Sequence, residues 1–150
     1  MSSLRQKALK LLTRREHSRF ELAQKLEKLG SPEEITAVLD HLEQTGLLSD
    51  QRAAATYLAS HAARFGAAKL KYALRAKGIA AELIEQCMEG DMAEALGSEQ
   101  GRALEVWRRK FAHPPADRRE WAKQARFLQS RGFSTNAITK TLKATEDDDA

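Results

Sequence analysis

Hydrophobic residues recur along this chain every three or four positions, and most residues between them are polar or charged. A period near 3.6 residues is typical of helices that bury one face. Nine stretches have this period, and no stretch alternates as a strand does. The predicted buried positions are Leu4, Ala8, Leu11, Leu12; Leu22, Leu26, Leu29; Ile35, Val38, Leu39, Leu42; Ala54, Tyr57, Leu58, Phe65; Leu70, Leu74; Leu83, Ile84, Cys87, Met88; Leu104, Trp107, Phe111; Trp121, Ala125, Leu128; and Ile138, Thr141, Leu142.

Three glycines divide these helices into similar groups. Gly30, Gly78 and Gly132 each follow one short hydrophobic helix pattern and precede another, at intervals of 48 and 54 residues. Recurrence at such a period is typical of repeat proteins, in which neighbouring units share a core and present an extended surface to a macromolecule. The sequence therefore predicts an all-α fold of about nine helices in three tandem three-helix repeats, residues 1–49, 50–97 and 98–145, arranged as an elongated array.

Helix start signals agree with these boundaries. Ser18 and Ser31 each precede a glutamate by three positions, the spacing of a capping box, in which serine and glutamate satisfy free amides at the helix start. Asp50 is the expected cap of the fourth helix and Asp117 that of the eighth. The three repeat glycines are expected in the left-handed conformation that follows many helices.

Composition indicates a globular protein of the cytosol. Of the 150 residues, 42% are hydrophobic and 31% are charged, which is normal for a soluble domain. No hydrophobic run approaches the roughly 18 residues of a membrane span, and the N-terminal residues lack a secretory core. The single cysteine, Cys87, lies at helical spacing from hydrophobic residues and is expected to be a buried small side chain.

Candidate catalytic chemistry is sparse. The four histidines, His17, His41, His61 and His113, have no partners at metal-ligand spacing, and the chain has no Gly-rich phosphate loop, HExxH or Gly-x-Ser-x-Gly motif. His17 beside Ser18 reads as part of a helix cap rather than as a nucleophile pair. We therefore expect a binding protein with no catalytic residues, metal site or cofactor.

Positive charge is concentrated in the third repeat. Residues 1–49 carry a net charge of +1, residues 50–97 are neutral, and residues 98–145 carry eleven basic against four acidic residues, a net +7. The last residues, 146–150, contain four acids and are expected to form a disordered tail. This acidic tail could fold back on the basic repeat as an internal competitor, or it could serve only for solubility.

One helix of the third repeat separates its charges by face. At about 100° per residue, Trp121 is expected to point into the core, while Arg119, Lys123 and Arg126 point outward. Such a stripe could follow nucleic-acid phosphates or an acidic protein surface, or it could simply be a solvated face. The neighbouring run Arg108-Arg109-Lys110 favours a binding role.

A second basic face lies on the fifth helix. Leu70 and Leu74 are expected to face inward, which leaves Tyr72 outside among cations, either as an interface anchor or packed on a neighbouring loop. The candidate partner-binding residues are Lys69, Lys71, Tyr72, Arg75, Arg108, Arg109, Lys110, Arg119, Lys123 and Arg126.

The order of motifs resembles the RecX regulatory proteins of bacteria. The residues that carry the resemblance are Ala8, Leu11, Leu12, Arg15-Glu16-His17-Ser18, Glu21-Leu22 and Leu26; Leu39, Leu42, Gly46-Leu47-Leu48-Ser49-Asp50 and Arg52; Tyr57, Gly66, Leu70, Leu74 and Lys77-Gly78-Ile79; and Arg109-Lys110-Phe111, Pro114-Pro115, Lys123-Gln124, Arg126-Phe127-Leu128 and Arg131-Gly132-Phe133. Ala53 and Ala67 depart from the residues common in the family, an aromatic and a proline. The likeness covers roughly residues 5–143.

This resemblance implies a regulator of RecA, the recombinase that polymerises on single-stranded DNA. Such proteins are expected to be curved arrays of three-helix units that lie in the groove of the RecA filament and limit its growth, strand exchange and coprotease activity. We expect a monomer without membrane contact, with weak direct DNA contact as a further expectation. The alternative from the residues themselves is a direct DNA-binding protein that acts without RecA through a helix-turn-helix in the third repeat.

Overall fold

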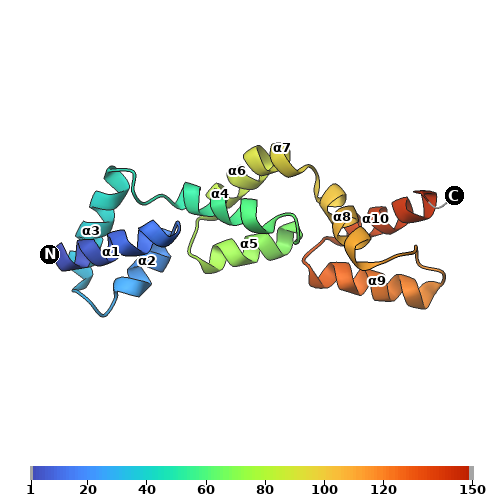
Figure 1. The fold of residues 1–150 in the computed structure, drawn as a ribbon, viewed down its shortest axis with the longest axis horizontal. Coiled ribbons are helices and arrows are strands. Elements are labelled where there is room, and N and C mark those ends of the chain that lie inside the picture. Colours follow the sequence, from blue (N-terminus) through green and yellow to red (C-terminus); the bar gives the residue numbers. More distant parts are fainter. Residues whose placement is uncertain (1, 149–150) are drawn as a thin grey trace. The chain divides into compact units, whose positions relative to one another are not determined.

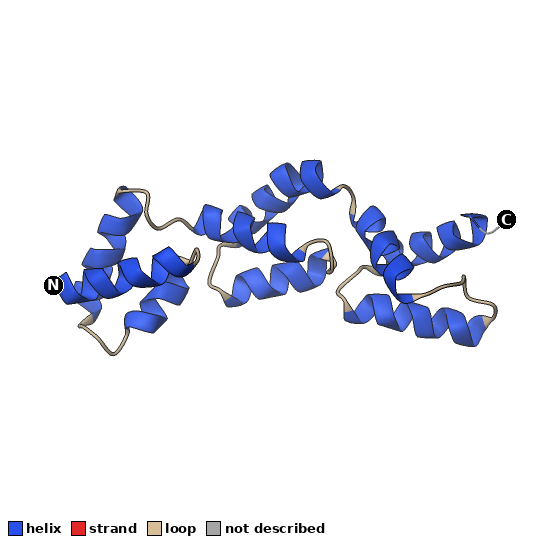
Figure 2. Ribbon diagram, viewed as in Figure 1, coloured by secondary structure: helices blue, strands red, loops and turns tan. Residues whose placement is uncertain are grey.

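The computed structural model describes residues 2–148, and every regular element in that range is a helix (Figures 1 and 2). The elements in chain order are α1 (Ser2–Arg14), α2 (Arg19–Leu26), α3 (Pro32–Gln44), α4 (Asp50–His61), α5 (Ala67–Ala76), α6 (Ala81–Cys87), η1 (Met88–Met92), α7 (Ala93–Leu96), α8 (Glu99–Lys110), α9 (Arg118–Ser130) and α10 (Thr135–Asp148). The all-α prediction is confirmed. The helix expected near Ile84 is α6, and the chain kinks after it at Gly90 (φ −92°, ψ −107°), whose backbone is not helical, before the short helix α7, which was not predicted.

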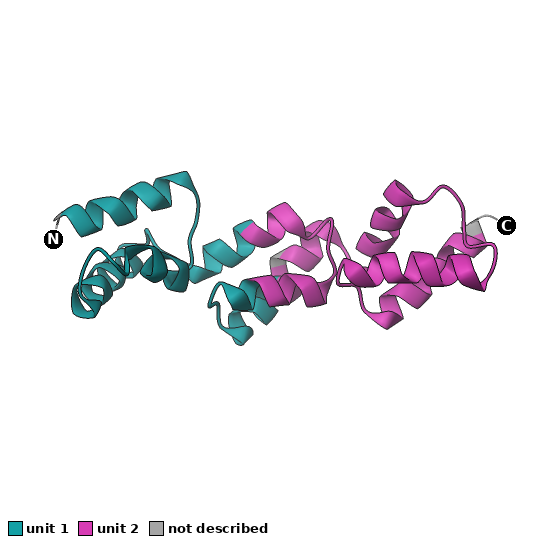
Figure 3. Ribbon diagram, turned by 90° about the horizontal axis from the view of Figure 1, so that it is seen from below, with its two compact units in different colours: residues 1–56, 74–87 teal, residues 57–73, 88–150 magenta. Residues whose placement is uncertain are grey.

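The chain forms two compact units, coloured separately in Figure 3. Unit 1 comprises residues 1–56 and 74–87, and unit 2 comprises residues 57–73 and 88–150. Helices α4 and α5 each contribute residues to both units. The segment 50–97, expected as one repeat, is thus divided between the units, and the predicted repeat boundaries stay a prediction.

In unit 1 the helices α1, α2 and α3 pack against one another around a core of leucines. The buried core residues are Leu4, Ala8, Leu11, Leu22, Leu26, Ile35, Leu39, Leu42 and Leu48. Both predicted capping boxes are present, at Ser18 and Ser31. Leu29 was expected in this core, but it is 55% exposed because α2 ends three residues earlier.

The prediction for Asp50 was wrong. The hydroxyl of Ser49 accepts the backbone N–H of Arg52 at 3.1 Å, and so Ser49 supplies the side-chain cap of α4. Asp50 instead accepts the backbone N–H of Arg19, 2.7 Å from its Oδ1. Its carboxylate is thereby used in a contact between distant segments of unit 1, which a local capping rule cannot detect.

In unit 2 the helices α8, α9 and α10 pack around a second core. Its buried residues are Ala103, Val106, Trp107, Leu128, Phe133, Ile138 and Leu142. Asp117 caps α9 as predicted, accepting from the Glu120 amide. Trp121 was expected inside but is 38% exposed. The Trp107 indole donates a hydrogen bond of 2.7 Å to Gln124, so the buried face of α9 is turned toward Gln124.

The three repeat positions require glycine for different structural reasons. Gly78 (φ +76°) and Gly132 (φ +90°) have the expected left-handed conformation. Gly30 does not, which corrects the prediction. A Cβ atom at Gly30 would lie 3.2 Å from Leu4 Cδ2, so tight packing rather than backbone conformation favours glycine there.

The expected disordered tail is also partly wrong. Helix α10 continues to Asp148, which places Glu146 and Asp147 on its last turns. Local helix propensity and the packed face of α10 extend the helix past the last core residue, Leu142. Asp149 and Ala150 lie outside the described residues.

Candidate macromolecular interface

The predicted basic face of α5 is present. Leu70 and Leu74 are fully buried, while Lys69 and Arg75 are exposed. Tyr72 is 78% exposed, which leaves its ring available to a partner. Lys71 is half-buried, so it presents less of its side chain than expected.

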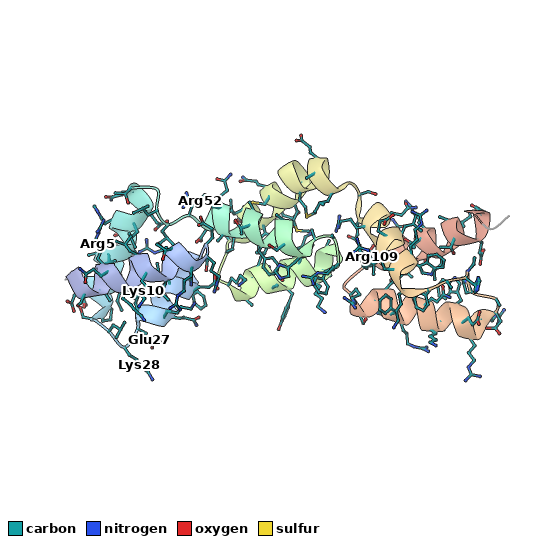
Figure 4. All side chains as sticks on the ribbon, viewed as in Figure 1. Arg5, Lys10, Glu27, Lys28, Arg52 and Arg109 are labelled. Carbon is teal, nitrogen blue, oxygen red and sulfur yellow. The ribbon has the colours of Figure 1, made fainter. Side chains whose placement is uncertain are left out.

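The predicted cations of unit 2 are exposed as well. Arg108, Arg109 and Lys110 form the last turn of α8, and Arg109 is labelled in Figure 4. Arg108 is paired with Glu105 one turn earlier, at 2.9 Å. On α9 the predicted outward stripe, Arg119, Lys123 and Arg126, is exposed at all three positions. The direction of these side chains agrees with the helical period, although Trp121 also lies at the surface.

The structure adds a group of residues that was not predicted as a site, the cation–aromatic cluster of Arg64, Phe65, Lys69, Phe127 and Arg131. Lys69 Nζ lies 4.7 Å from the centre of the Phe65 ring. The guanidinium carbons of Arg64 and Arg131 each lie 5.7 Å from that centre. Arg131 also lies 5.2 Å from the centre of the Phe127 ring. At these distances the ring faces attract the cations and hold their positions.

Two backbone hydrogen bonds bring this cluster together. Gly66 N–H donates to Arg131 O at 2.8 Å, and Ala68 N–H donates to Gly132 O at 3.3 Å. The α4–α5 loop therefore lies directly on the α9–α10 turn. A Cβ atom at Gly66 would lie 2.3 Å from Gly132 O and 2.5 Å from Phe133 Cα, so this approach requires a glycine.

A cavity of about 230 Å³, which we call the basic cavity, lies beside the cluster in unit 2. Its lining residues are Arg64, Val106, Arg109, Lys110, Phe127 and Arg131. Four of the six are cations and none is acidic. Lys110 Nζ lies 5.6 Å from the centre of the Phe127 ring, so this cation too is positioned by an aromatic face. The cavity can accept an anion from solvent.

Sequence reasoning predicted Arg109 and Lys110 but missed Arg64 and Arg131. Phe65 was treated only as a helix core residue, yet it is half-buried under three cations. No local signal singles out these two arginines, because Arg-Phe pairs occur at 19–20, 64–65 and 126–127 and none of them contains Arg131. Only the fold shows that the two loops meet.

Unit 1 uses its charges differently, in a partly buried junction around Glu21. The carboxylate accepts from Arg15 at 3.0 Å, from Lys77 at 3.2 Å and from the backbone N–H of Ser18 at 3.0 Å. Burial alone would raise the pKa of Glu21, but the hydrogen bonds from Ser18, Arg15 and Lys77 outweigh it and lower the pKa to about 2. This carboxylate therefore stays ionised and connects α2 to the end of α5.

His17 lies beside that junction and is buried. Its Nε2 lies 2.8 Å from Lys25 Nζ, and its Nδ1 lies 3.1 Å from Arg15 O. Because a lysine ammonium can only donate, Nε2 accepts and Nδ1 carries the proton. Burial lowers the pKa of His17, as do the charges of Arg15 and Lys25, and so the imidazole is neutral. Its place at the start of α2 is that of a structural residue.

Two further kinds of site are absent from the described residues, 2–148. No helix there is both long and apolar enough to cross a membrane. No three of its histidine, cysteine, aspartate or glutamate side chains with described positions converge as metal ligands would.

Comparison with known proteins gives one consistent family. Residues 5–42, 49–88 and 98–142 match the family models for the first, second and third three-helix domains of RecX. The chain is 45% identical to the regulatory protein RecX of Leptothrix cholodnii over 142 residues, 94% of this chain and 88% of that protein. It is 42% identical to the protein of the same name from Herbaspirillum seropedicae over 142 residues, 94% and 90% of the two chains.

The fold agrees with this family. The crystal structure of RecX from Lactobacillus salivarius superposes with a TM-score of 0.80 and covers 97% of this chain and 96% of that one, at 19% identity. A second crystal structure, of a regulatory protein RecX, has a TM-score of 0.69 and 23% identity and covers 93% of this chain and 70% of that one. The resemblance and the three-helix repeats expected from the sequence are confirmed.

Proposed function

We propose that this chain, which belongs to the RecX family of regulatory proteins, is a non-enzymatic regulator of homologous recombination and DNA repair that acts on RecA. It binds the filament that RecA forms on single-stranded DNA, limits strand exchange and inhibits the coprotease activity that leads to the SOS response. The observation that carries the proposal is the match to all three RecX domains, in order, along one chain. It works in the cytoplasm, as a monomer, without a cofactor.

The exposed cations provide a physical basis for filament binding. A RecA filament contains DNA and is therefore a polyanion, toward which a basic surface is steered by long-range attraction. The outward stripe Arg119, Lys123 and Arg126 gives three exposed cations along one helix. Tyr72 with Lys69 and Arg75 gives an exposed aromatic residue among cations, a composition common in the centres of interfaces.

The proposal is tested with filaments assembled from RecA, single-stranded DNA and ATP. The purified chain is titrated against strand exchange and against coprotease cleavage. In the triple variant Arg119→Ser, Lys123→Ser, Arg126→Ser we expect inhibition to require about tenfold more protein, the equivalent of about 1.4 kcal/mol. Each exposed position should change the free energy of unfolding by no more than about 0.5 kcal/mol.

A charge-matched variant supplies the control. Lys7, Lys10 and Lys28 are exposed in unit 1, and replacing all three with serine removes the same charge. We expect that variant to inhibit nearly as well as the original chain. If the original chain has no effect on RecA filaments, the proposed function is wrong. If both triple variants lose inhibition equally, the effect comes from net charge rather than from the α9 stripe.

Direct DNA binding without RecA is the second candidate function. The net charge of +7 over residues 98–145 favours it. On naked duplex DNA, each neutralised phosphate contributes a slope of about −0.9 in log affinity against log salt. Regulation that is unchanged when RecA is absent, together with a steep salt slope, would select this candidate over the first.

A further inference from the structure

Four cations of unit 2 converge on the basic cavity without carboxylate partners. Arg64, Arg109, Lys110 and Arg131 line it, and none of them forms an ion pair with any acidic side chain whose position the structure describes. Like charges held close together repel, and the ring faces of Phe65 and Phe127 offset only part of that repulsion. The C-terminal end of α8 adds at most about half a negative charge. An anion is the missing component.

We propose that the basic cavity binds a phosphate group of a nucleic-acid backbone. Guanidinium groups bind phosphate through paired, charge-assisted hydrogen bonds, and three of the four cations are arginines. Arg131 lies against two ring faces, so little side-chain freedom remains to be lost when the anion binds. A volume of about 230 Å³ accommodates one phosphate with its nearest waters but not a folded peptide segment.

The surroundings favour a nucleic acid over an acidic peptide. Lys69 lies over the same Phe65 ring as Arg64 and Arg131 of the cavity lining, so a chain bearing one phosphate per residue meets a further cation beside the cavity. Val106 and Phe127 add apolar surface to the wall, which suits the sugar carbons of a backbone. A peptide carboxylate has neither the second charge nor the regular spacing that would use these groups.

A RecA filament on single-stranded DNA carries backbone phosphates, so a phosphate site in the basic cavity deepens the proposed function. The inference rests on the proposed function only where the filament is the source of the phosphate. The site is a property of unit 2 itself. Binding of naked DNA therefore tests the phosphate site without RecA. If naked DNA does not bind at the cavity, the result of the RecA filament assay is unaffected.

The experiment measures binding of the full chain to fluorescent oligothymidylate at low salt, followed by a salt titration. The variant is Arg64→Gln with Arg109→Gln, because both side chains are exposed and neither is needed for the core. We expect the affinity to fall about tenfold or more, and the salt slope to become shallower by about 0.7 for each phosphate contact that is lost. Circular dichroism of the variant should be unchanged.

The matched control is Lys10→Gln with Lys28→Gln, two exposed cations labelled in Figure 4 that belong to unit 1. It removes the same charge and should weaken oligothymidylate binding by less than about twofold, because long-range attraction is screened by salt. Arg131→Lys is a second cavity variant, which keeps the charge but removes the planar fork. It should bind oligothymidylate several-fold more weakly while inorganic pyrophosphate still competes.

Competition distinguishes the sources of the anion. Oligothymidylate should shift the Nε resonances of Arg64 and Arg131, pyrophosphate should compete only at much higher concentration, and polyglutamate should compete poorly. An equal loss of oligothymidylate affinity in the cavity and control variants would overturn the proposal. Unchanged affinity in both variants would overturn it as well. Pyrophosphate binding as tight as that of the oligonucleotide would assign the cavity to free phosphates, and stronger competition by polyglutamate would assign it to an acidic protein.

Discussion

The two units of this chain differ in how they hold several of their cations. In unit 1, Arg15 is paired with Glu21, Arg52 is paired with Glu16 at 3.1 Å, and Arg19 is paired with Asp40 and Glu43. In unit 2, Arg64, Lys69, Arg131 and Lys110 lie over phenylalanine rings. A paired cation is satisfied within the fold. A cation over a ring keeps its charge available to an anion from outside.

The difference shows that net charge by itself does not locate an interface. Residues 1–49 contain eight basic residues, but seven acids accompany them. The pairs join helices of unit 1 and stabilise its junction. In unit 2 the rings orient the cations without neutralising them, and this is why we propose unit 2 for the binding role, while the charges around Glu21 join parts of the fold.

The largest expected loss of stability comes from disturbing the contact between the α4–α5 loop and the α9–α10 turn, which brings the cation–aromatic cluster together. Gly66→Ala should destabilise unit 2 by about 3 kcal/mol or more, because the new methyl group meets backbone atoms that cannot move aside. Hydrogen exchange should show lower protection at Leu128 and unchanged protection at Leu22, a core residue of unit 1.

Gly46→Ala is the matched control for that variant. Gly46 has a positive φ of +79°, but nothing lies within 4 Å of an added Cβ, so the cost is backbone strain of about 1 kcal/mol. Equal losses at Gly66 and Gly46 would show that the close approach of the two loops contributes nothing.

The next largest loss of stability is expected at one of two serines that cap helices in unit 1. Ser18 is fully buried, accepts the Glu21 amide and donates to Lys77 O at 2.5 Å. Ser18→Ala leaves two groups without partners and should cost about 2 kcal/mol in thermal or denaturant unfolding. Ser31→Ala removes the same kind of cap at a site open to solvent and should cost about 1 kcal/mol or less. A smaller loss at Ser18 would contradict a structural role for the junction.

Acid should weaken unit 1 through Glu21. Its pKa of about 2 lies below the ordinary value of 4.5, so its contribution is complete above pH 4.5 and is lost as the pH falls toward 2. Glu21→Gln should remove that part of the pH dependence and, with solvent screening, cost about 1 kcal/mol at neutral pH. Unfolding followed from pH 7 to 2 checks this, and a variant with the original pH profile would refute it.

Acid should also weaken unit 1 through His17, at a higher pH than through Glu21. Its pKa is lowered below 6.5 in the fold, so the unfolded chain takes up the proton first and stability falls as the pH drops below 6.5. His17→Gln should flatten the stability profile around that pH. An unchanged slope there would mean that the imidazole takes up its proton at the same pH in the folded and in the unfolded chain.

The smallest expected effect is on the stability of the basic cavity. Arg64→Gln with Arg109→Gln should change the free energy of unfolding by no more than about 0.5 kcal/mol, and relief of repulsion between like charges could raise it. Arg15→Gln in unit 1, by contrast, removes a partner of Glu21 and should be destabilising. Denaturant unfolding of the two variants compares them directly, and a larger loss from the cavity variant would make its cations structural.

The sequence alone predicted what depends on neighbours within one or two helical turns. The helical period located α1 to α6 and α8 to α10 but not the short helix α7, and the caps at Ser18, Ser31 and Asp117 followed from side chains that reach amides three residues away. The outward direction of Arg119, Lys123 and Arg126 followed from the same period. The order of motifs also gave the family, because capping and core residues specify a fold.

Tertiary contacts decided the rest. The Asp50 carboxylate accepts from the backbone N–H of Arg19, thirty-one positions away, instead of capping its own helix. On α9 the buried position is Gln124, which accepts from the Trp107 indole, and Trp121 lies at the surface. Arg64 and Arg131 meet only because Gly66 lets two loops touch, and no local rule links residues so far apart. A period fixes which face of a helix is apolar, but what lies against that face, and which charges find partners, depends on segments that only folding brings together.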